Sequence, residues 1–294
     1  MVREILLGDN PFIGVSHLAQ EKAREEKKNL PTVRSRAAVI EAAAEGGVTG
    51  FTFSTHALNY ELLQYMLDNH PVTLQALNYY ILTPYAQSYV RQANLFGTAG
   101  LAKSLLRDIV LENPAGVLSA LFTLDFDKIA GLFISREARP YLKILPKERV
   151  KAILLHEVLT ELIIAFDLAD LLQELKKYIE TRLGVGFGVE TRNIHRLRSF
   201  LDEHSLSVEY VMTPLNPLGY QMGVREEAED SVKALSSRGA KIIAVNILAS
   251  GACTLEESTA YLSRFKQYIY AVAFGTSKPD RAKANAQHLR SHLE

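Results

Sequence analysis

The sequence predicts a closed (β/α)8 barrel of the α/β class, a TIM barrel, from three observations. Short apolar runs of strand-forming residues alternate with helical patterns, which is typical of parallel sheets covered by helices. Eight such runs can be counted along the 294 residues. No Gly-x-Gly-x-x-Gly motif follows the first run, which favours a barrel over a doubly wound nucleotide-binding sheet. We therefore expect a single domain spanning residues 1–294.

The expected strands are short and apolar, and the expected helices carry apolar residues three and four positions apart. Gly46-Gly47 ends the first helix, Pro71 follows the second, and Gly239 ends the helix before the seventh strand. In chain order, the expected strands cover residues 5–10, 49–55, 72–77, 151–156, 184–189, 207–212, 241–248 and 270–274. The expected helices cover residues 34–45, 60–69, 168–183, 192–204, 226–238, 255–267 and the residues from Pro279 onward.

Residues 85–146, between the third and fourth strands, interrupt this alternation. They are rich in Leu, Ala and Phe, with predicted breaks at Gly97, 114–116 and Pro140. A single return helix needs far fewer residues, so we expect a helical insertion on the catalytic rim. Two interpretations stay open: a lid or homo-oligomer surface, or an elaboration of the outer helical layer.

Composition excludes several classes of protein. Lys plus Arg and Asp plus Glu number 33 each, so no overall charge attracts nucleic acid or an anionic membrane. Cys253 is the single cysteine, which excludes an internal disulfide framework. The first residues include an acid and lack a long apolar stretch, and no apolar run of about 18 residues occurs anywhere. We expect a soluble, cytoplasmic protein.

The segment that follows the last expected strand has the features of an anion site. Pro279 suits the first position of a helix, and Asp280 complements the helix dipole in the first turn. Two hydroxyls and two cations lie beside this helix start, which itself attracts anions. An ordinary turn with solvated charges is the alternative. The residues expected to bind a phosphate group are Gly275, Thr276, Ser277, Lys278 and Arg281.

Polar residues at the expected strand ends should meet at one mouth, because a barrel of this kind carries its active site there. His156 is the first candidate, since it directly follows an apolar strand and an imidazole exchanges protons near neutral pH. His56, Asp9 and Glu190 are candidate acid–base or ligand groups. The other polar residues expected at this mouth are Asn10, Ser54, Thr55, Gln75, Asn78, Glu157, Thr191, Thr213, Asn216, Asn246, Thr276 and Ser277.

Five segments of the second half carry motifs of a known family. They are Ile153-Leu154-Leu155-His156, Gly186-Phe187-Gly188-Val189, residues 208–214, residues 245–251, and residues 275–281 with Asn285. Over residues 151–285 these motifs resemble the fourth to eighth strands of the aldo-keto reductase superfamily. The resemblance implies a reductase that uses NAD(P), with Asn246, Asn285 and the 275–281 turn as cofactor-binding residues.

The resemblance ends at the residues that carry the family's chemistry, a set of Asp, Tyr, Lys and His. Ser54 replaces the aspartate, and the tyrosine is lost to Asn59 or shifted by one to Tyr60. No lysine occurs around residues 75–78, where the third strand is expected to supply it. Two further departures lie at the nicotinamide end: Glu190-Thr191 and Val245.

Three hypotheses remain. The first is an aldo-keto-reductase-like enzyme acting on a small phosphorylated or nucleotide-type ligand, with catalytic residues drawn from His156, His56, Asp9, Glu190 and Tyr60. The second is a metal-dependent hydrolase, lyase or isomerase, because mixed imidazole and carboxylate groups suit a divalent metal. Its ligands would be Asp9, His56, His156 and Glu190. The third is a ligand-binding or scaffold barrel without catalysis.

Overall fold

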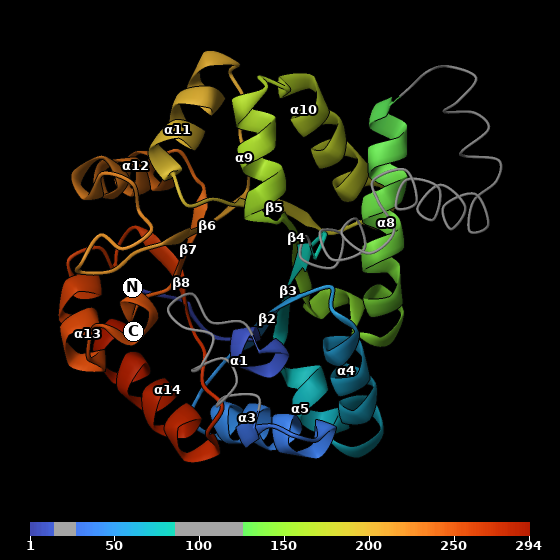
Figure 1. Ribbon diagram of the computed structural model, residues 1–294, viewed down its shortest axis with the longest axis vertical. Coiled ribbons are helices and arrows are strands. Elements are labelled where there is room, and N and C mark those ends of the chain that lie inside the picture. Colours follow the sequence, from blue (N-terminus) through green and yellow to red (C-terminus); the bar gives the residue numbers. More distant parts are fainter. Residues whose placement is uncertain (15–27, 86–125) are drawn as a thin grey trace.

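The computed structural model describes residues 1–14, 28–85 and 126–294, and they form a closed barrel (Figure 1). The strands run parallel in chain order, and β8 closes the ring by pairing with β1. The strands are β1 Glu4–Gly8, β2 Gly50–Ser54, β3 Asn78–Thr83, β4 Val150–Leu155, β5 Gly186–Glu190, β6 Tyr210–Pro214, β7 Lys241–Val245 and β8 Ile269–Phe274. The predicted (β/α)8 class is confirmed.

Helices form the outer layer around the strands in Figure 1. They are α1 Asn10–Ile13, α3 Val33–Glu45, α4 Ala57–Asn69, α5 Pro71–Ala76, α8 Phe126–Ile144, α9 Glu157–Ala165, α10 Ala169–Tyr178, α11 Ile194–Glu203, α12 Arg225–Ser237, α13 Leu255–Ser263 and α14 Pro279–Leu293. Short turns of other helix types cover Lys147–Arg149, Ile179–Leu183 and Ala249–Gly251. Among the described helices, none has the length and apolarity that crossing a membrane requires.

The third strand lies further along the chain than predicted. Residues 72–77 were predicted as strand, but most of them belong to α5, and β3 covers Asn78–Thr83. Pro71 holds a first-turn position of α5, where its fixed φ suits a helix. The following Asn-Tyr-Tyr-Ile-Leu-Thr concentrates residues that favour strands. Gln75 and Asn78 were therefore wrongly placed: Gln75 lies in α5, and Asn78 begins β3 instead of following its end.

The insertion expected at residues 85–146 can be compared with the structure mainly from α8 onward. Pro140 was predicted to break a helix but lies inside α8. Beyond it, Tyr141 is buried and its hydroxyl donates to the backbone oxygen of His56 at 2.9 Å, which anchors the helix despite the missing backbone donor. Residues 86–125 lie outside the described residues, and they include the predicted breaks at Gly97 and 114–116. The interpretation of the insertion as a lid or homo-oligomer surface concerns these same residues.

Two apolar layers hold the barrel together. The larger one packs outward-facing strand residues such as Phe51, Phe53 and Phe187 against the helices. The smaller one fills the inside of the barrel and includes Leu6 and Leu154. Successive strand residues face opposite sides of a sheet. Because Phe51 and Phe53 face the helices, the side chain of Thr52 between them faces the inside of the barrel.

A buried polar network fills the amino end of the barrel. One carboxylate oxygen of Glu4 accepts hydrogen bonds from the hydroxyls of Tyr80, at 3.0 Å, and Tyr270, at 2.6 Å. The ammonium of Lys241 lies 4.6 Å from the ring centroid of Tyr210 and 5.4 Å from that of Tyr270. These contacts satisfy groups that would be costly to bury alone. Because side chains fill the amino end of the barrel, we expect a ligand to bind at its carboxyl end.

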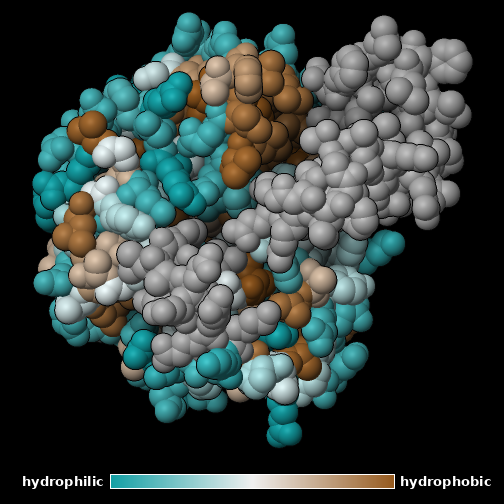
Figure 2. Space-filling view, viewed as in Figure 1, coloured by the Kyte–Doolittle hydropathy of each residue, from teal (hydrophilic) through white to brown (hydrophobic). Residues whose placement is uncertain are grey.

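Helix α9 presents apolar side chains to solvent beside that end. Val158 and Leu162 are each 47% exposed, and Phe166, just past the helix, is 69% exposed. Their spacing of four places them along one stripe of the helix. Figure 2 shows an apolar area where α9 and α10 lie in Figure 1.

Candidate active site

A cavity of about 580 Å³ lies at the carboxyl ends of the strands. All eight strands contribute residues at or just beyond these ends, so the barrel geometry alone collects them around one opening. Its volume falls in the range typical of small-molecule sites. The residues at or just beyond the strand ends are Asp9, Ser54, Tyr85, His156, Glu190, Pro214, Val245 and Gly275, in strand order.

Asp9 follows β1, and its carboxyl group is buried in the cavity wall. Its Oδ2 accepts hydrogen bonds from the backbone nitrogen of Ser54, at 2.9 Å, and from Nδ2 of Asn59, at 2.6 Å. Burial raises the pKa of Asp9 to about 6, and the hydrogen bonds oppose this rise. Asp9 is therefore mostly ionised at pH 7 and can still accept a proton, as a general base requires.

Glu190 ends β5 and also lines the cavity. Burial, followed by repulsion from the Glu157 carboxylate, raises the pKa of Glu190 to about 8. The backbone nitrogen of Glu157 donates to Glu190 Oε2 at 3.2 Å and, with the charge of Arg192, opposes this rise. Glu190 is consequently protonated at neutral pH and can donate its proton.

The carboxylate of Glu157 itself is held in a two-point ion pair. Both of its oxygens accept hydrogen bonds from the guanidinium of Arg192, through Nε and Nη2. The Glu157 side chain is 18% exposed and that of Arg192 is 41% exposed. Both residues line the cavity next to Glu190. The charges of Glu157 and Arg192 balance each other. The neutral carboxyl group of Glu190 therefore lies beside an ion pair with no net charge.

His156 and His56 occupy equivalent positions, each directly before a helix. His156 Nδ1 accepts a hydrogen bond from the backbone nitrogen of Val158 at 3.3 Å, and His56 Nδ1 accepts one from Leu58 at 3.0 Å. Each histidine thus caps the helix that follows its strand. A neutral ring that accepts at Nδ1 carries its hydrogen on Nε2. His156 also lines the cavity, whereas His56 does not.

His56 and Tyr60 differ from His156 in that neither is among the cavity-lining residues. The His56 ring packs edge-on against Tyr85, which does line the cavity, with ring centroids 4.8 Å apart. Tyr60 is 36% exposed and packs edge-on against Tyr141 at 5.7 Å. The structure therefore brings together Asp9, His156 and Glu190, and places His56 behind Tyr85.

The proposed metal ligands do not form a cluster. Within the described ranges, no group of three or more His, Cys, Asp or Glu side chains is arranged to hold a metal ion. Several of their polar atoms are engaged elsewhere: Nδ1 of each histidine accepts from a backbone nitrogen, and Asp9 Oδ2 accepts two hydrogen bonds. In addition, the His56 ring packs against Tyr85 and does not line the cavity. The divalent-metal hypothesis gains no support from these contacts.

The turn before α14 lines the cavity on the side opposite the end of β4, which His156 follows. Thr276, Ser277 and Arg281 line it, together with Asn285 one turn further along the helix, whereas Lys278 is exposed and does not. Thr276 Oγ1 accepts from the backbone nitrogen of Lys278 at 3.3 Å, which closes the turn. The lining residues supply two hydroxyls, one guanidinium and one amide beside a helix N-terminus.

The glycine that begins this turn allows close packing. The φ of Gly275 is not positive, so the backbone conformation itself does not require a glycine. A Cβ atom at Gly275, however, would lie 3.0 Å from Cδ of Pro11. Gly275 therefore permits the loop after β1 and the turn after β8 to approach each other, which brings the two walls of the cavity together.

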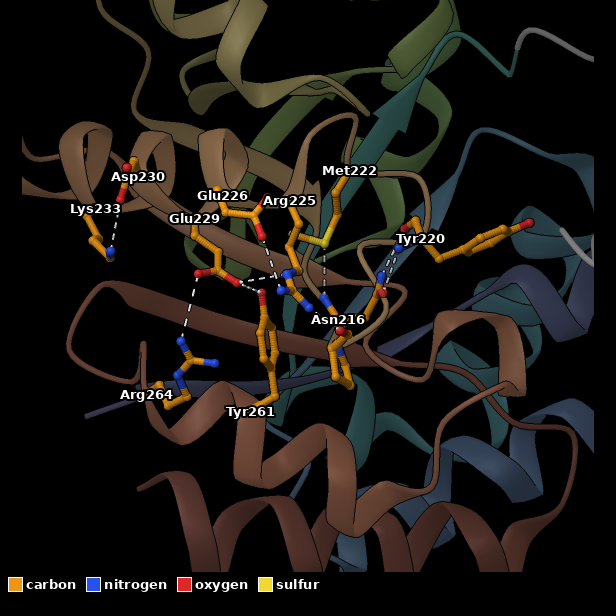
Figure 3. Close-up of polar contacts among 11 residues, drawn as sticks. Asn216, Tyr220, Met222, Arg225, Glu226, Glu229, Asp230, Lys233, Tyr261 and Arg264 are labelled. Atoms are coloured by element: carbon orange, nitrogen blue, oxygen red, sulfur yellow. Dashed lines mark hydrogen bonds and ion pairs between the residues drawn. The ribbon is translucent and has the colours of Figure 1, made fainter.

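Hydrogen bonds fix the loop after β6, which forms part of the rim (Figure 3). Asn216 Nδ2 donates to the backbone oxygen of Tyr220, and Asn216 Oδ1 accepts from the Tyr220 nitrogen, both at 2.9 Å. The Asn216 nitrogen also contacts the sulfur of Met222 at 3.3 Å. Between these anchors, Gln221 lines the cavity and accepts a hydrogen bond from Asn246 Nδ2 at 3.1 Å. Asn246 also lines the cavity, and its amide group positions Gln221.

Sequence reasoning missed several cavity residues. Arg192, Tyr85 and Gln221 line the cavity and were not among the candidates. Arg192 follows Glu190 by two residues, and a cation so close to a strand-end carboxylate was a usable signal. Tyr85 was hidden by the misplaced third strand. Nothing in the local sequence around Gln221 separates it from an ordinary loop residue.

Solved structures similar to this one are aldo-keto reductases. A protein from Pseudomonas aeruginosa assigned to that family has a TM-score of 0.58 at 15% identity, covering 100% of this chain and 92% of that one. The aldo-keto reductase AKR11C1 from Bacillus halodurans, in its holo form, gives 0.55 at 12% identity, covering 99% and 92%. The glycerol dehydrogenase AKR11B4 from Gluconobacter oxydans gives 0.51 at 11% identity, covering 96% and 85%.

The chain has the fold of the aldo-keto reductases. At 11–15% identity this likeness concerns the fold alone. No protein-family model matches the sequence, and no curated protein matches it.

The departures from the aldo-keto reductase motifs now have structural locations. Ser54 was expected at the position of the family's aspartate, and Asn59 or Tyr60 at that of the tyrosine. The backbone nitrogen of Ser54 and Nδ2 of Asn59 both donate to Asp9. The observed end of β3, at Thr83, is followed by proline and tyrosine, so this aldo-keto reductase fold lacks a lysine there as well. Val245 lines the cavity. The backbone of Ser54 and the side chain of Asn59 thus hold the Asp9 carboxylate.

Proposed function

We propose that this protein is an oxidoreductase that binds a nicotinamide dinucleotide and interconverts a small carbonyl compound and its alcohol, with Glu190 as the proton donor. One observation carries the proposal: a single cavity contains both a donor-rich turn suited to phosphate and, on another strand end, the carboxyl group of Glu190 beside a second acid, Glu157. Burial and this neighbour raise the pKa of Glu190, which favours its protonated form. The fold shared with aldo-keto reductases supports the same conclusion.

The residues of the α14 turn fit the phosphate end of such a cofactor. Thr276, Ser277, Arg281 and Asn285 offer hydrogen-bond donors of the kinds that hold phosphate oxygens. On the cavity floor, the hydroxyl of Thr52 is buried without a hydrogen-bond partner, so a bound ligand can satisfy it. When bound, the dinucleotide supplies or accepts the hydride.

At the other end of the cavity, the chain's own groups handle the substrate oxygen. Glu190 donates its proton to the oxygen of a carbonyl substrate and regains it in the reverse direction. His156 lines the same cavity and is the second candidate donor to this oxygen. Glu190 thereby takes the role of proton donor that a tyrosine has in the family motif. Reduction should be fastest below the Glu190 pKa of about 8 and decline above it.

The test is a titration of NADH and NADPH, followed by their own fluorescence. The chain contains no tryptophan, so the emission of a bound reduced nicotinamide is easily separated from that of the protein. Arg281→Met should weaken binding about tenfold, because it removes a charge-assisted contact to phosphate. Lys283→Met is the matched control: it removes one positive charge from the same helix, at a residue that pairs with Glu45 and does not line the cavity.

Three outcomes separate the hypotheses. Selective weakening by Arg281→Met, with turnover lost in Glu190→Gln, supports the proposal. Tight dinucleotide binding without turnover of any carbonyl compound or alcohol tested contradicts the catalytic part and favours a ligand-binding barrel. Absence of binding of either dinucleotide overturns the proposal.

A further inference from the structure

Two carboxyl groups lie on opposite sides of the same cavity. In the closed ring of eight strands, β1 and β5 are four strands apart and therefore face each other across the barrel. Asp9 follows β1, Glu190 ends β5, and both line the cavity. A substrate between them meets one carboxyl group on each side. Isomerisation through an enediol can use this arrangement, because one group removes a proton from carbon while the other protonates the oxygen.

The surroundings of the two groups assign them different roles. Asp9 is held by the backbone nitrogen of Ser54 and the amide of Asn59, and both donors favour its carboxylate form. Glu190 accepts only one described hydrogen bond, from the backbone of Glu157, and it lies beside a second acid. Pairs of carboxyl groups that differ in this way divide into a base and an acid. The pKa values of about 6 and about 8 agree with that division.

The charges around the two carboxyl groups favour an uncharged substrate group between them. Asp9 is ionised, Glu190 is neutral, and the charges of Glu157 and Arg192 are paired with each other. An additional carboxylate placed between them would be repelled by the ionised Asp9. An aldehyde or ketone with a neighbouring hydroxyl carries no charge and offers both oxygens and a removable proton.

We infer that the cavity catalyses the isomerisation of small α-hydroxy carbonyl compounds without a dinucleotide, with Asp9 as the base and Glu190 as the acid. For an α-hydroxy aldehyde, the Asp9 carboxylate takes the proton from C2. The electron pair of that C–H bond forms the C1–C2 double bond, and the carbonyl oxygen takes the proton of Glu190. An enediol results.

The second half of the reaction restores both residues. The hydroxyl on C2 returns its proton to the Glu190 carboxylate and becomes a carbonyl group, while the double-bond electrons take the proton held by Asp9 onto C1. The product is the isomeric ketone. No oxidant, reductant or metal enters the balance, and both carboxyl groups end in their starting forms. The reaction therefore stands independently of the proposed dinucleotide chemistry.

The experiment uses the full chain, freed of nucleotide and kept in a chelator, with D-glyceraldehyde in D2O. Proton NMR follows loss of the C2 hydrogen signal and formation of dihydroxyacetone. We expect both to exceed the rate without protein, and Asp9→Asn and Glu190→Gln each to lower them at least about 100-fold, the usual range for a general acid or base. Glu203→Gln, an exposed carboxylate of α11, is the control that should leave the rate unchanged.

The outcomes are independent of dinucleotide binding. Exchange that survives in Glu190→Gln overturns the assignment of the acid, and absence of exchange in the native chain overturns the inference as a whole. If Asp9→Asn fails to fold, as judged by circular dichroism, Glu190→Gln alone decides, because an amide suits that site. Dinucleotide binding without exchange would leave the proposed oxidoreductase intact and remove only this activity.

Discussion

The ionisation of Glu190 gives a prediction that needs no substrate. Replacing Glu190 with Gln keeps the shape of the side chain and an oxygen that can accept from the Glu157 nitrogen, but removes the titratable proton. Because the pKa of Glu190 is raised to about 8, the native chain binds more protons than the unfolded chain between pH 4.5 and about 8. Its free energy of unfolding must therefore fall as the pH rises through this window.

The size of the effect follows from the two pKa values. Each pH unit of difference corresponds to about 1.36 kcal/mol. Between an ordinary value of 4.5 and about 8, the burial of an ionised Glu190 costs the native chain roughly 1 kcal/mol at pH 5 and roughly 5 kcal/mol at pH 9. Glu190→Gln avoids this cost, so its stability advantage over the native chain should grow by roughly 4 kcal/mol from pH 5 to pH 9.

Urea denaturation followed by far-ultraviolet circular dichroism at pH 5, 7 and 9 measures this difference. Glu203→Gln, which removes an exposed carboxylate from α11, should differ from the native chain by less than about 0.5 kcal/mol throughout. A Glu190→Gln advantage that stays constant with pH, or that shrinks as the pH rises, would refute the reasoning about the buried carboxyl group.

Three further substitutions test how the barrel is held together. Tyr80→Phe removes one donor from buried Glu4 and should lower the free energy of unfolding by about 1–2 kcal/mol in urea; no change would contradict the network. Gly188→Ala would place a Cβ 2.5 Å from a leucine methyl of β4 and 2.8 Å from a backbone oxygen of β6, so Tm should fall by several degrees, and an unchanged Tm would show that β5 tolerates the methyl. Asn59→Ala should cost about 1–3 kcal/mol at pH 8 and less at pH 5, where Asp9 is protonated; equal losses at both pH values would mean that its bond to the carboxylate is unimportant.

The sequence predicted the barrel because apolar residues recur with different spacings in strands and in helices. Seven of the eight strands could be located from these spacings. The third could not, since residues 72–77 are as apolar as a strand. Only the proline at 71, placed where it starts a helix, separates the two readings. The fifth strand was predicted at 184–189 and lies at Gly186–Glu190, because Gly184 ends the preceding helix in a left-handed conformation.

The sequence could predict those site residues whose location depends only on their position at the end of a strand. Asp9, His156 and Glu190 follow from the rule that a barrel carries its chemistry at the carboxyl ends. Side-chain direction could not be predicted in the same way. His56 has the same local sequence position as His156, yet it packs on Tyr85, whose place depends on the true end of β3. The pairing of Glu157 with Arg192 likewise depends on tertiary contact.

The instability that an ionised Glu190 causes also bears on function. At neutral pH, a glutamate at position 190 should lower the free energy of unfolding, and a glutamine of the same shape should not. Packing alone therefore does not explain why a carboxyl group occupies this position. Groups that destabilise a fold in this way concentrate at sites where a protonation state is used. If Glu190→Gln proves more stable and also loses both carbonyl reduction and hydrogen exchange, the same proton accounts for the cost and for the chemistry. A more stable variant that retains both activities would separate them, and would return His156 to the position of first candidate.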